Sequence, residues 1–277
     1  MADQDVSKPA HSPKPVHIGG ESIVDRLAPH IKKILVAFVL LAVILTVVFA
    51  IRWFQQRGQV ANTEKLVAVL DVARKPVVPP SSTDQPADPN APKPEGYPSA
   101  SARAAAVLDT LTKQGATVSP TYRGGLLLDA GKLDEAIAEY RNGVADKTID
   151  GVLAREGLGI ALETKATAEK DATARQKLLE EALAAFVSMQ PDPAGPRRSY
   201  ALYHQGRIQL TLGKRAEATA SFDAAKKLAA PNGLSPEIVG QMAIGSRQAL
   251  QTCVERYDMG ACELLSLIEQ RLGAMGT

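Results

Sequence analysis

Histidines that could serve in catalysis are scarce in this sequence. Of the four histidines, His11, His17 and His30 precede a long apolar run, and His204 stands alone in the remainder of the chain. A hydrolytic triad requires a histidine beside its nucleophile. The stretch "GGLLLDAGK" also lacks the GxxxxGK[ST] spacing of a phosphate-binding loop. We therefore predict that the protein is not an enzyme and binds no small-molecule substrate.

Cys253 and Cys262 could form a disulfide, because they are nine residues apart with "DMG" between them. One continuous helix would hold them about 13.5 Å apart, which is too far for a bond. If "YDMG" turns the chain, a disulfide becomes feasible and an oxidising compartment would favour it. Two buried free thiols are the alternative, and the sequence leaves both open. A zinc site would need these cysteines together with scattered carboxylates, so we predict no metal and no cofactor.

Two phrases recur in the same register, "AGKLDEAIAEY" from Ala130 and "LGKRAEATASF" from Leu212. Counting from the glycine six residues before each phrase, glycine, glycine, alanine and an aromatic residue stand at offsets 0, 7, 12 and 16. A third copy between them fits if 11 residues are inserted. The residues expected to pack the repeats are Gly124, Gly131, Ala136, Tyr140, Gly159, Ala182, Phe186, Gly206, Gly213, Ala218 and Phe222.

This spacing resembles the tetratricopeptide repeat, a helical hairpin. Small residues let the two helices approach, glycine ends the first helix, and the aromatic ring fills space between hairpins. Three hairpins can bury one another's apolar faces, so we predict an all-α solenoid of tetratricopeptide-like repeats over residues 99–233. Gln205 departs from the pattern, which has an apolar residue there. The insert, 165–176, should lengthen both helices of the second hairpin. A generic alanine-rich bundle is the alternative.

An apolar run near the N-terminus predicts a transmembrane helix over residues 34–54. Its 18 residues from Ile34 to Ile51 contain no charge, proline or glycine, and would reach roughly 27 Å as a helix. A buried core helix or a cleaved signal peptide fits less well, because of the uniform apolarity and the 33-residue leader. Five Lys or Arg residues flank each side, so charge does not set the orientation.

The remaining segments follow from local composition. Residues 1–33 are expected to form a polar tail, 55–75 a first soluble helix, and 234–277 a C-terminal helical cap. A signal anchor with a long translocated domain would place the tail in the cytoplasm, which is the orientation we expect. Eight of the 23 residues in 76–98 are proline, which predicts a disordered loop. A ligand for a proline-recognising module is the alternative for that loop.

Stacked hairpins curve, and their first helices line the concave face. By repeat position, a groove that binds an extended or helical protein segment should contain Leu128, Asp129, Glu156, Glu163, Tyr200, Tyr203 and Arg207. The formal net charge of +2 gives no argument for a nucleic-acid partner.

The order of parts resembles the ancillary SecYEG translocon subunit family. A short tail with "IVDRLAPHIKKI", one span, "IRW" and then degenerate helical repeats carry the resemblance, over residues 21–230. It implies a single-pass protein of the bacterial inner membrane with its C-terminal domain in the periplasm. Its partners would be the Sec translocon and periplasmic chaperones. A scaffold for cell-envelope assembly or division is the alternative function.

Overall fold

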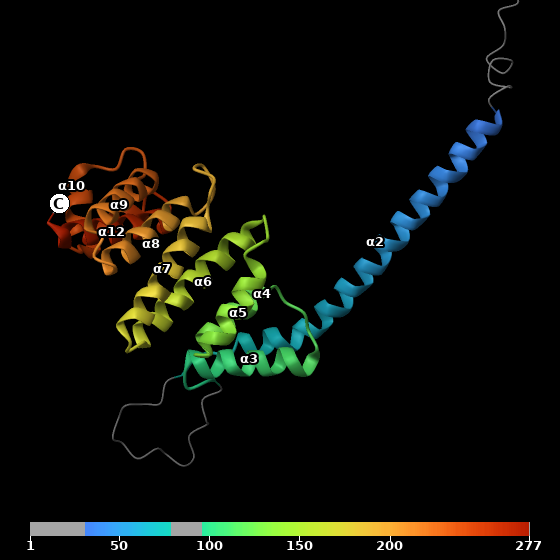
Figure 1. The fold of residues 1–277 in the computed structure, drawn as a ribbon, viewed down its shortest axis with the longest axis horizontal. Helices are drawn as coiled ribbons and strands as arrows, with labels where there is room; N and C mark the ends of the chain where they lie inside the picture. The colour runs from blue at the N-terminus through green and yellow to red at the C-terminus, as the bar shows by residue number, and fades with distance from the viewer. Residues whose placement is uncertain (1–30, 79–95, 277) are drawn as a thin grey trace, which may run out of the picture. The chain divides into compact units, whose positions relative to one another are not determined.

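The computed structural model describes residues 31–78 and 96–276 of the chain, and most of them are helical (Figure 1). Within these ranges no strand occurs, although Val77 and Tyr97 form an isolated parallel bridge. The prediction of an all-α fold is therefore confirmed. The helices are α2 (Ile31–Ala73), α3 (Ala100–Gln114), α4 (Pro120–Asp129), α5 (Leu133–Gly143), α6 (Ile149–Ala168), α7 (Ala172–Met189), α8 (Arg198–Thr211), α9 (Arg215–Ala229), α10 (Pro236–Ala243), α11 (Arg247–Val254) and α12 (Met259–Met275).

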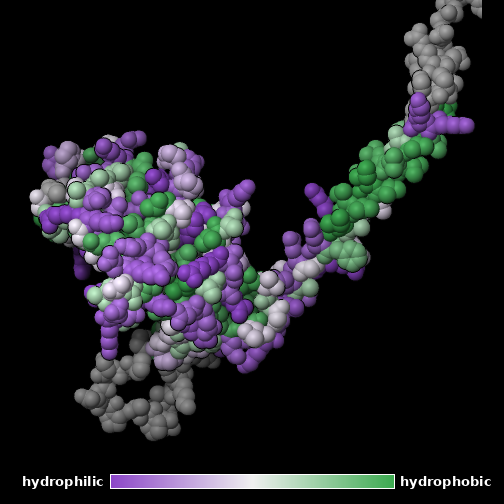
Figure 2. All heavy atoms as spheres, in the orientation of Figure 1, coloured by the Kyte–Doolittle hydropathy of each residue, from purple (hydrophilic) through white to green (hydrophobic). Residues whose placement is uncertain are grey.

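Helix α2 is long and apolar enough to span a membrane, and its most apolar 18-residue window has no buried residue. Figure 2 shows its apolar atoms as a continuous green band. Helix α2 is continuous through the predicted span over 34–54 and most of the predicted soluble helix over 55–75, and it ends at Ala73. The connecting residues contain no proline, and the single Gly58 weakens a helix without ending it.

The chain divides into two compact units after Ala61, and the second unit holds the hairpins. In that unit, Val69 of α2 forms an apolar cluster with Val107 and Leu111 of α3. The amide and carbonyl of Thr117 are both bonded by the side chain of Asn62. The predicted tail lies outside the described residues up to residue 30, as does most of the predicted Pro-rich loop, at 79–95.

Three helical hairpins follow one another, formed by α4 with α5, α6 with α7, and α8 with α9. Gly131 and Gly213 follow the C-cap residues of α4 and α8 with positive φ values of 80° and 76°, so glycine ends the first helix of the outer hairpins. In the second hairpin the side chain of Asp171 caps α7 instead. There α6 has 20 residues and α7 has 18, against 10 and 11 in the first hairpin, so the insert lengthens both helices.

Within each hairpin an aromatic ring lies on a glycine of the first helix. A Cβ added to Gly124 would fall 2.8 Å from the Tyr140 ring, one on Gly159 2.6 Å from Phe186, and one on Gly206 2.8 Å from Phe222. Only glycine leaves room for these contacts. The alanines predicted at the same crossings, Ala136, Ala182 and Ala218, are fully buried. The repeated spacing therefore encodes one packing arrangement used three times.

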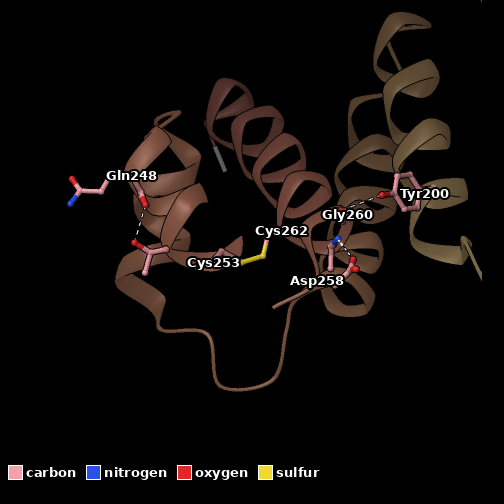
Figure 3. Close-up of a disulfide and its surroundings, with 8 residues drawn as sticks. Tyr200, Gln248, Cys253, Asp258, Gly260 and Cys262 are labelled. Carbon is pink, nitrogen blue, oxygen red and sulfur yellow. Dashed lines mark hydrogen bonds between the residues drawn. A yellow bond between two sulfur atoms is a disulfide. The ribbon is translucent and has the colours of Figure 1, made fainter. Parts of the chain in front are cut away.

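Helices α10, α11 and α12 follow the third hairpin. Leu264, Ile268 and Leu272 of α12 pack in one apolar cluster with Phe222 of α9. Of the two states left open for the cysteines, the structure contains the disulfide: the chain turns between α11 and α12, and Cys253 is bonded to Cys262 (Figure 3). At the start of α12 the Tyr200 hydroxyl donates to the Gly260 carbonyl at 3.2 Å, which ties the cap to α8.

Candidate functional site

An open groove of about 680 Å³ lies between α6, α8 and α12, and it is the candidate site. Helices α6 and α8 are the first helices of the second and third hairpins, so the groove lies where the concave face was expected. Its lining residues are Ile160, Glu163, Thr164, Thr167, Ala168, Tyr203, His204, Arg207 and Arg271.

The groove contains part of the set of seven residues predicted to bind a partner. Three of them, Glu163, Tyr203 and Arg207, line the groove. The other four, Leu128, Asp129, Glu156 and Tyr200, are not among its lining residues.

Tyr203 and Glu156 are each only 8% exposed, and each is covered by a segment outside the repeat pattern. Tyr203 lies in the apolar cluster that α12 makes with α9. Glu156 is held by Arg197, which precedes α8. The repeat position alone could not predict that α12 would bury Tyr203 or that Arg197 would bind Glu156.

A buried carboxylate, Glu156, is the centre of a polar network between α6 and α8. Arg197 donates to both of its oxygens, with Nε to Oε2 at 2.8 Å, and His204 Nε2 lies 3.3 Å from Oε1. Burial would raise the pKa of Glu156, but the hydrogen bonds from His204 and Arg197 and the Arg197 charge outweigh it and lower that pKa. The carboxylate is therefore ionised and paired.

His204 connects this carboxylate to a second ion pair. Arg207 donates to Glu163 through two nitrogens, both at 2.7 Å, and its NH2 group lies 3.1 Å from His204 Nδ1. A guanidinium can only donate, so the hydrogen-bond pattern makes Nδ1 the acceptor and places the proton of a neutral imidazole on Nε2, facing Glu156. The His204 ring also stacks on Phe186 of α7, with 4.6 Å between ring centroids. Both ring nitrogens are engaged.

Arg197 adopts an unusual backbone conformation to make these contacts. Its φ is 65°, in the left-handed region, and its guanidinium also lies 4.4 Å from the centroid of the Tyr200 ring. A non-glycine residue there is strained by the order of 1 kcal/mol and persists only when its surroundings hold it. The bidentate pair with Glu156 supplies that restraint.

Sequence reasoning missed three residues that matter at this site: Arg197, Arg271 and, as a member of the network, His204. Arg197 lies in the proline-rich turn before α8, which the sequence marks only as a break. Arg271 comes from α12, and its approach to the groove depends on tertiary packing. Gln205 did carry a signal, since it breaks the apolar pattern of the repeat. Its amide donates to the Phe186 carbonyl in the last turn of α7, which has no helical partner there.

A second hollow, of about 690 Å³, lies where the second hairpin meets its neighbouring turns. Arg155 crosses it and donates to the carbonyl oxygens of Val144 and Met189, which end α5 and α7. These are carbonyls that a helix leaves without partners, so Arg155 serves the packing of the hairpins.

In the part of the chain that the structure describes, no group of three His, Cys, Asp or Glu side chains could hold a metal ion. The groove presents guanidinium groups, threonine hydroxyls and apolar side chains, which can bind a protein segment. Comparisons with protein-family models, curated proteins and solved structures gave no match.

Proposed function

We propose that the chain is a membrane-anchored protein-binding module with tetratricopeptide-like repeats. The observation that carries the proposal is the open groove between the first helices of two stacked hairpins, in a chain that also has a helix apolar enough to span a membrane. Successive hairpins present such grooves to extended or helical partner segments.

We propose that α2 is an uncleaved anchor in the bacterial inner membrane, with the N-terminus in the cytoplasm and the hairpins in the periplasm. The buried disulfide between Cys253 and Cys262 supports this orientation, because such bonds persist in oxidising compartments such as the periplasm. The orientation otherwise rests on the resemblance to the ancillary SecYEG subunit family.

The proposed partners are the Sec translocon and the periplasmic chaperones that receive emerging proteins. They come from the same resemblance, carried by the order of tail, span and helical repeats. A scaffold for envelope assembly or division would use the same groove on different proteins.

Photocrosslinking in intact membranes tests this proposal. A photoreactive residue at Thr164, which is exposed in the groove, should capture translocon subunits or periplasmic chaperones. Tyr203 is unsuitable, because it is buried. The matched control is the same residue at Ala220, which is exposed on α9 and does not line the groove.

Three outcomes count against parts of the proposal. Envelope-assembly or division proteins captured at Thr164 would favour the scaffold alternative. Cytoplasmic proteins alone would overturn the orientation. Equal capture at both positions would mean that the groove is not the binding site.

A further inference from the structure

We infer that the groove recognises a carboxylate on its partner and that Arg271 of α12 is the residue that pairs with it. The inference rests on the proposed function and deepens it, because it states which chemistry the bound segment must carry. It concerns the charges in the groove, which α6, α8 and α12 supply.

The charges supplied by α6 and α8 already satisfy one another. Both oxygens of Glu163 accept from Arg207, and His204 is engaged at both nitrogens. Arg207 Nε is enclosed, with no hydrogen-bond partner in the described part of the chain, so an incoming group cannot reach it. These two helices present a neutral, preorganised surface.

Arg271 differs from Arg207 in being exposed and free. Within residues 31–78 and 96–276, no ion pair or hydrogen bond involves its side chain. It therefore leaves the groove with one uncompensated positive charge. A guanidinium pairs best with a planar anion that accepts two parallel hydrogen bonds, which is the geometry of a carboxylate.

The apolar and hydroxyl-bearing residues that line the groove favour a protein segment as the ligand. Ile160 and Ala168 give the α6 wall apolar surface beside Thr164 and Thr167, whose hydroxyls donate to their own helix and retain lone pairs. A cavity of about 680 Å³ has room for a few side chains. The matching ligand is a short peptide with an acidic side chain next to an apolar one.

The charge balance of the groove favours a carboxylate over a phosphate as the partner group. Glu163 and Arg207 neutralise each other, so Arg271 leaves one positive charge, which a single carboxylate balances, whereas a phosphate dianion would leave a net negative charge in the groove. The inference therefore commits to Asp or Glu in the partner rather than to a phosphorylated residue.

The test is selection of random heptapeptides displayed on phage against the full chain in lipid nanodiscs, followed by binding measurements on the best peptide. Selected peptides should be enriched in Asp or Glu next to an apolar residue. Arg271→Ala should weaken binding of the best peptide by about tenfold, as expected for loss of a charge-assisted hydrogen bond. Arg271→Glu should shift the selection toward Lys and Arg.

Matched controls distinguish loss of the Arg271 charge from a general disturbance of the fold. Arg256→Ala removes another exposed arginine of the cap, outside the groove, and should leave affinity unchanged. Replacing the peptide's Glu with Gln should cost wild type about tenfold and cost the Arg271→Ala variant nothing further.

The outcomes distinguish this inference from the proposed function. Peptides that bind the groove without acidic enrichment, or equally well to Arg271→Ala, would overturn the carboxylate inference and leave the module a binding protein. Preference for phosphoserine over glutamate would overturn it too. No peptide retained above empty nanodiscs would count against both.

Discussion

The three hairpins meet at two junctions, which differ in chemistry at equivalent positions. The first hairpin contacts the second through an apolar contact, and the second contacts the third through a polar network. At the first junction the Tyr140 ring meets Gly157, where an added Cβ would lie 2.3 Å from the ring. At the second junction the Phe186 ring meets His204. Both contacted residues stand two positions before the small residue of their repeat, Gly159 or Gly206.

The ion pairs of the two junctions are also distributed differently. Across the first junction, Lys165 with Asp134 and Arg141 with Glu181 lie at the exposed rim. Across the second, the side chain of Glu156 is only 10% exposed and is held by Arg197 and His204. One repeat pattern therefore accommodates an apolar contact with charges outside or a polar network within, and the polar junction is the one that borders the groove.

Phe186→Ala should have the largest effect on stability. The ring is fully buried, lies on Gly159 and stacks on His204, so its loss leaves a cavity beside the network. We expect a loss of about 3–5 kcal/mol in the free energy of unfolding. Urea denaturation of the full chain in detergent, followed by circular dichroism, measures it. Val187→Ala, at the exposed neighbour, should cost under about 0.5 kcal/mol, and similar costs for both would contradict the role of the ring.

Glu156→Gln should come next, at about 2–3 kcal/mol, because it leaves Arg197 and His204 without a charged acceptor. The estimate lies below that for a fully buried pair since the Arg197 side chain is 31% exposed. Glu181→Gln breaks an exposed pair at the first junction and should cost at most about 0.5 kcal/mol in the same denaturation measurement. Equal costs would remove the distinction between the junctions.

Gly157→Ala should cost about 1–3 kcal/mol, because the new methyl group would collide with the Tyr140 ring. In a Tyr140→Leu background the added cost should fall close to zero, which a double-mutant cycle measures. Gly240→Ala is the matched control: it lies within α10 with open space around it, so alanine should stabilise by about 0.5–1 kcal/mol. Destabilisation by Gly157→Ala that persists without the ring would refute the contact.

A pH dependence should give the smallest effect. The pKa of Glu156 in the folded chain is lowered from its ordinary value of 4.5. A lowered pKa means that this stabilisation is fully present above the unfolded value and is lost as pH falls through the folded value. The stability difference between wild type and Glu156→Gln should therefore shrink as pH falls from about 4.5 through the lower folded value. A difference that stays constant over this range would contradict the pairing of an ionised Glu156.

The spacing of small and aromatic residues was enough to predict the hairpins, because each contact of Gly124 with Tyr140 or Gly206 with Phe222 depends on residues of one repeat. The polar junction could not be predicted in the same way. Glu156 and Arg197 are 41 residues apart, and their meeting depends on the length of the inserted second hairpin and on a left-handed residue in a turn.

Burial by segments outside the repeats explains why other predicted site residues are not exposed in the groove. Tyr203 occupies a repeat position that would face the groove, and α12 buries it through a cluster with Leu264. Tertiary packing also changes the chemistry of Tyr140. Burial, followed by the negative charges of Asp129 and Glu156, raises its pKa to about 12. Such effects belong to tertiary packing and not to local pattern.

The disulfide between Cys253 and Cys262 has a mechanical consequence. If the C-terminal end is pulled, the chain cannot lengthen between these two residues, because tension passes through the sulfur atoms. Their nine-residue separation would extend to roughly 32 Å as open chain, against the 5.9 Å between their α-carbons in the bonded state. Single-molecule extension traces under reducing and oxidising conditions would therefore differ by about 26 Å of contour length. The disulfide therefore keeps the turn between α11 and α12 closed when the C-terminus is pulled.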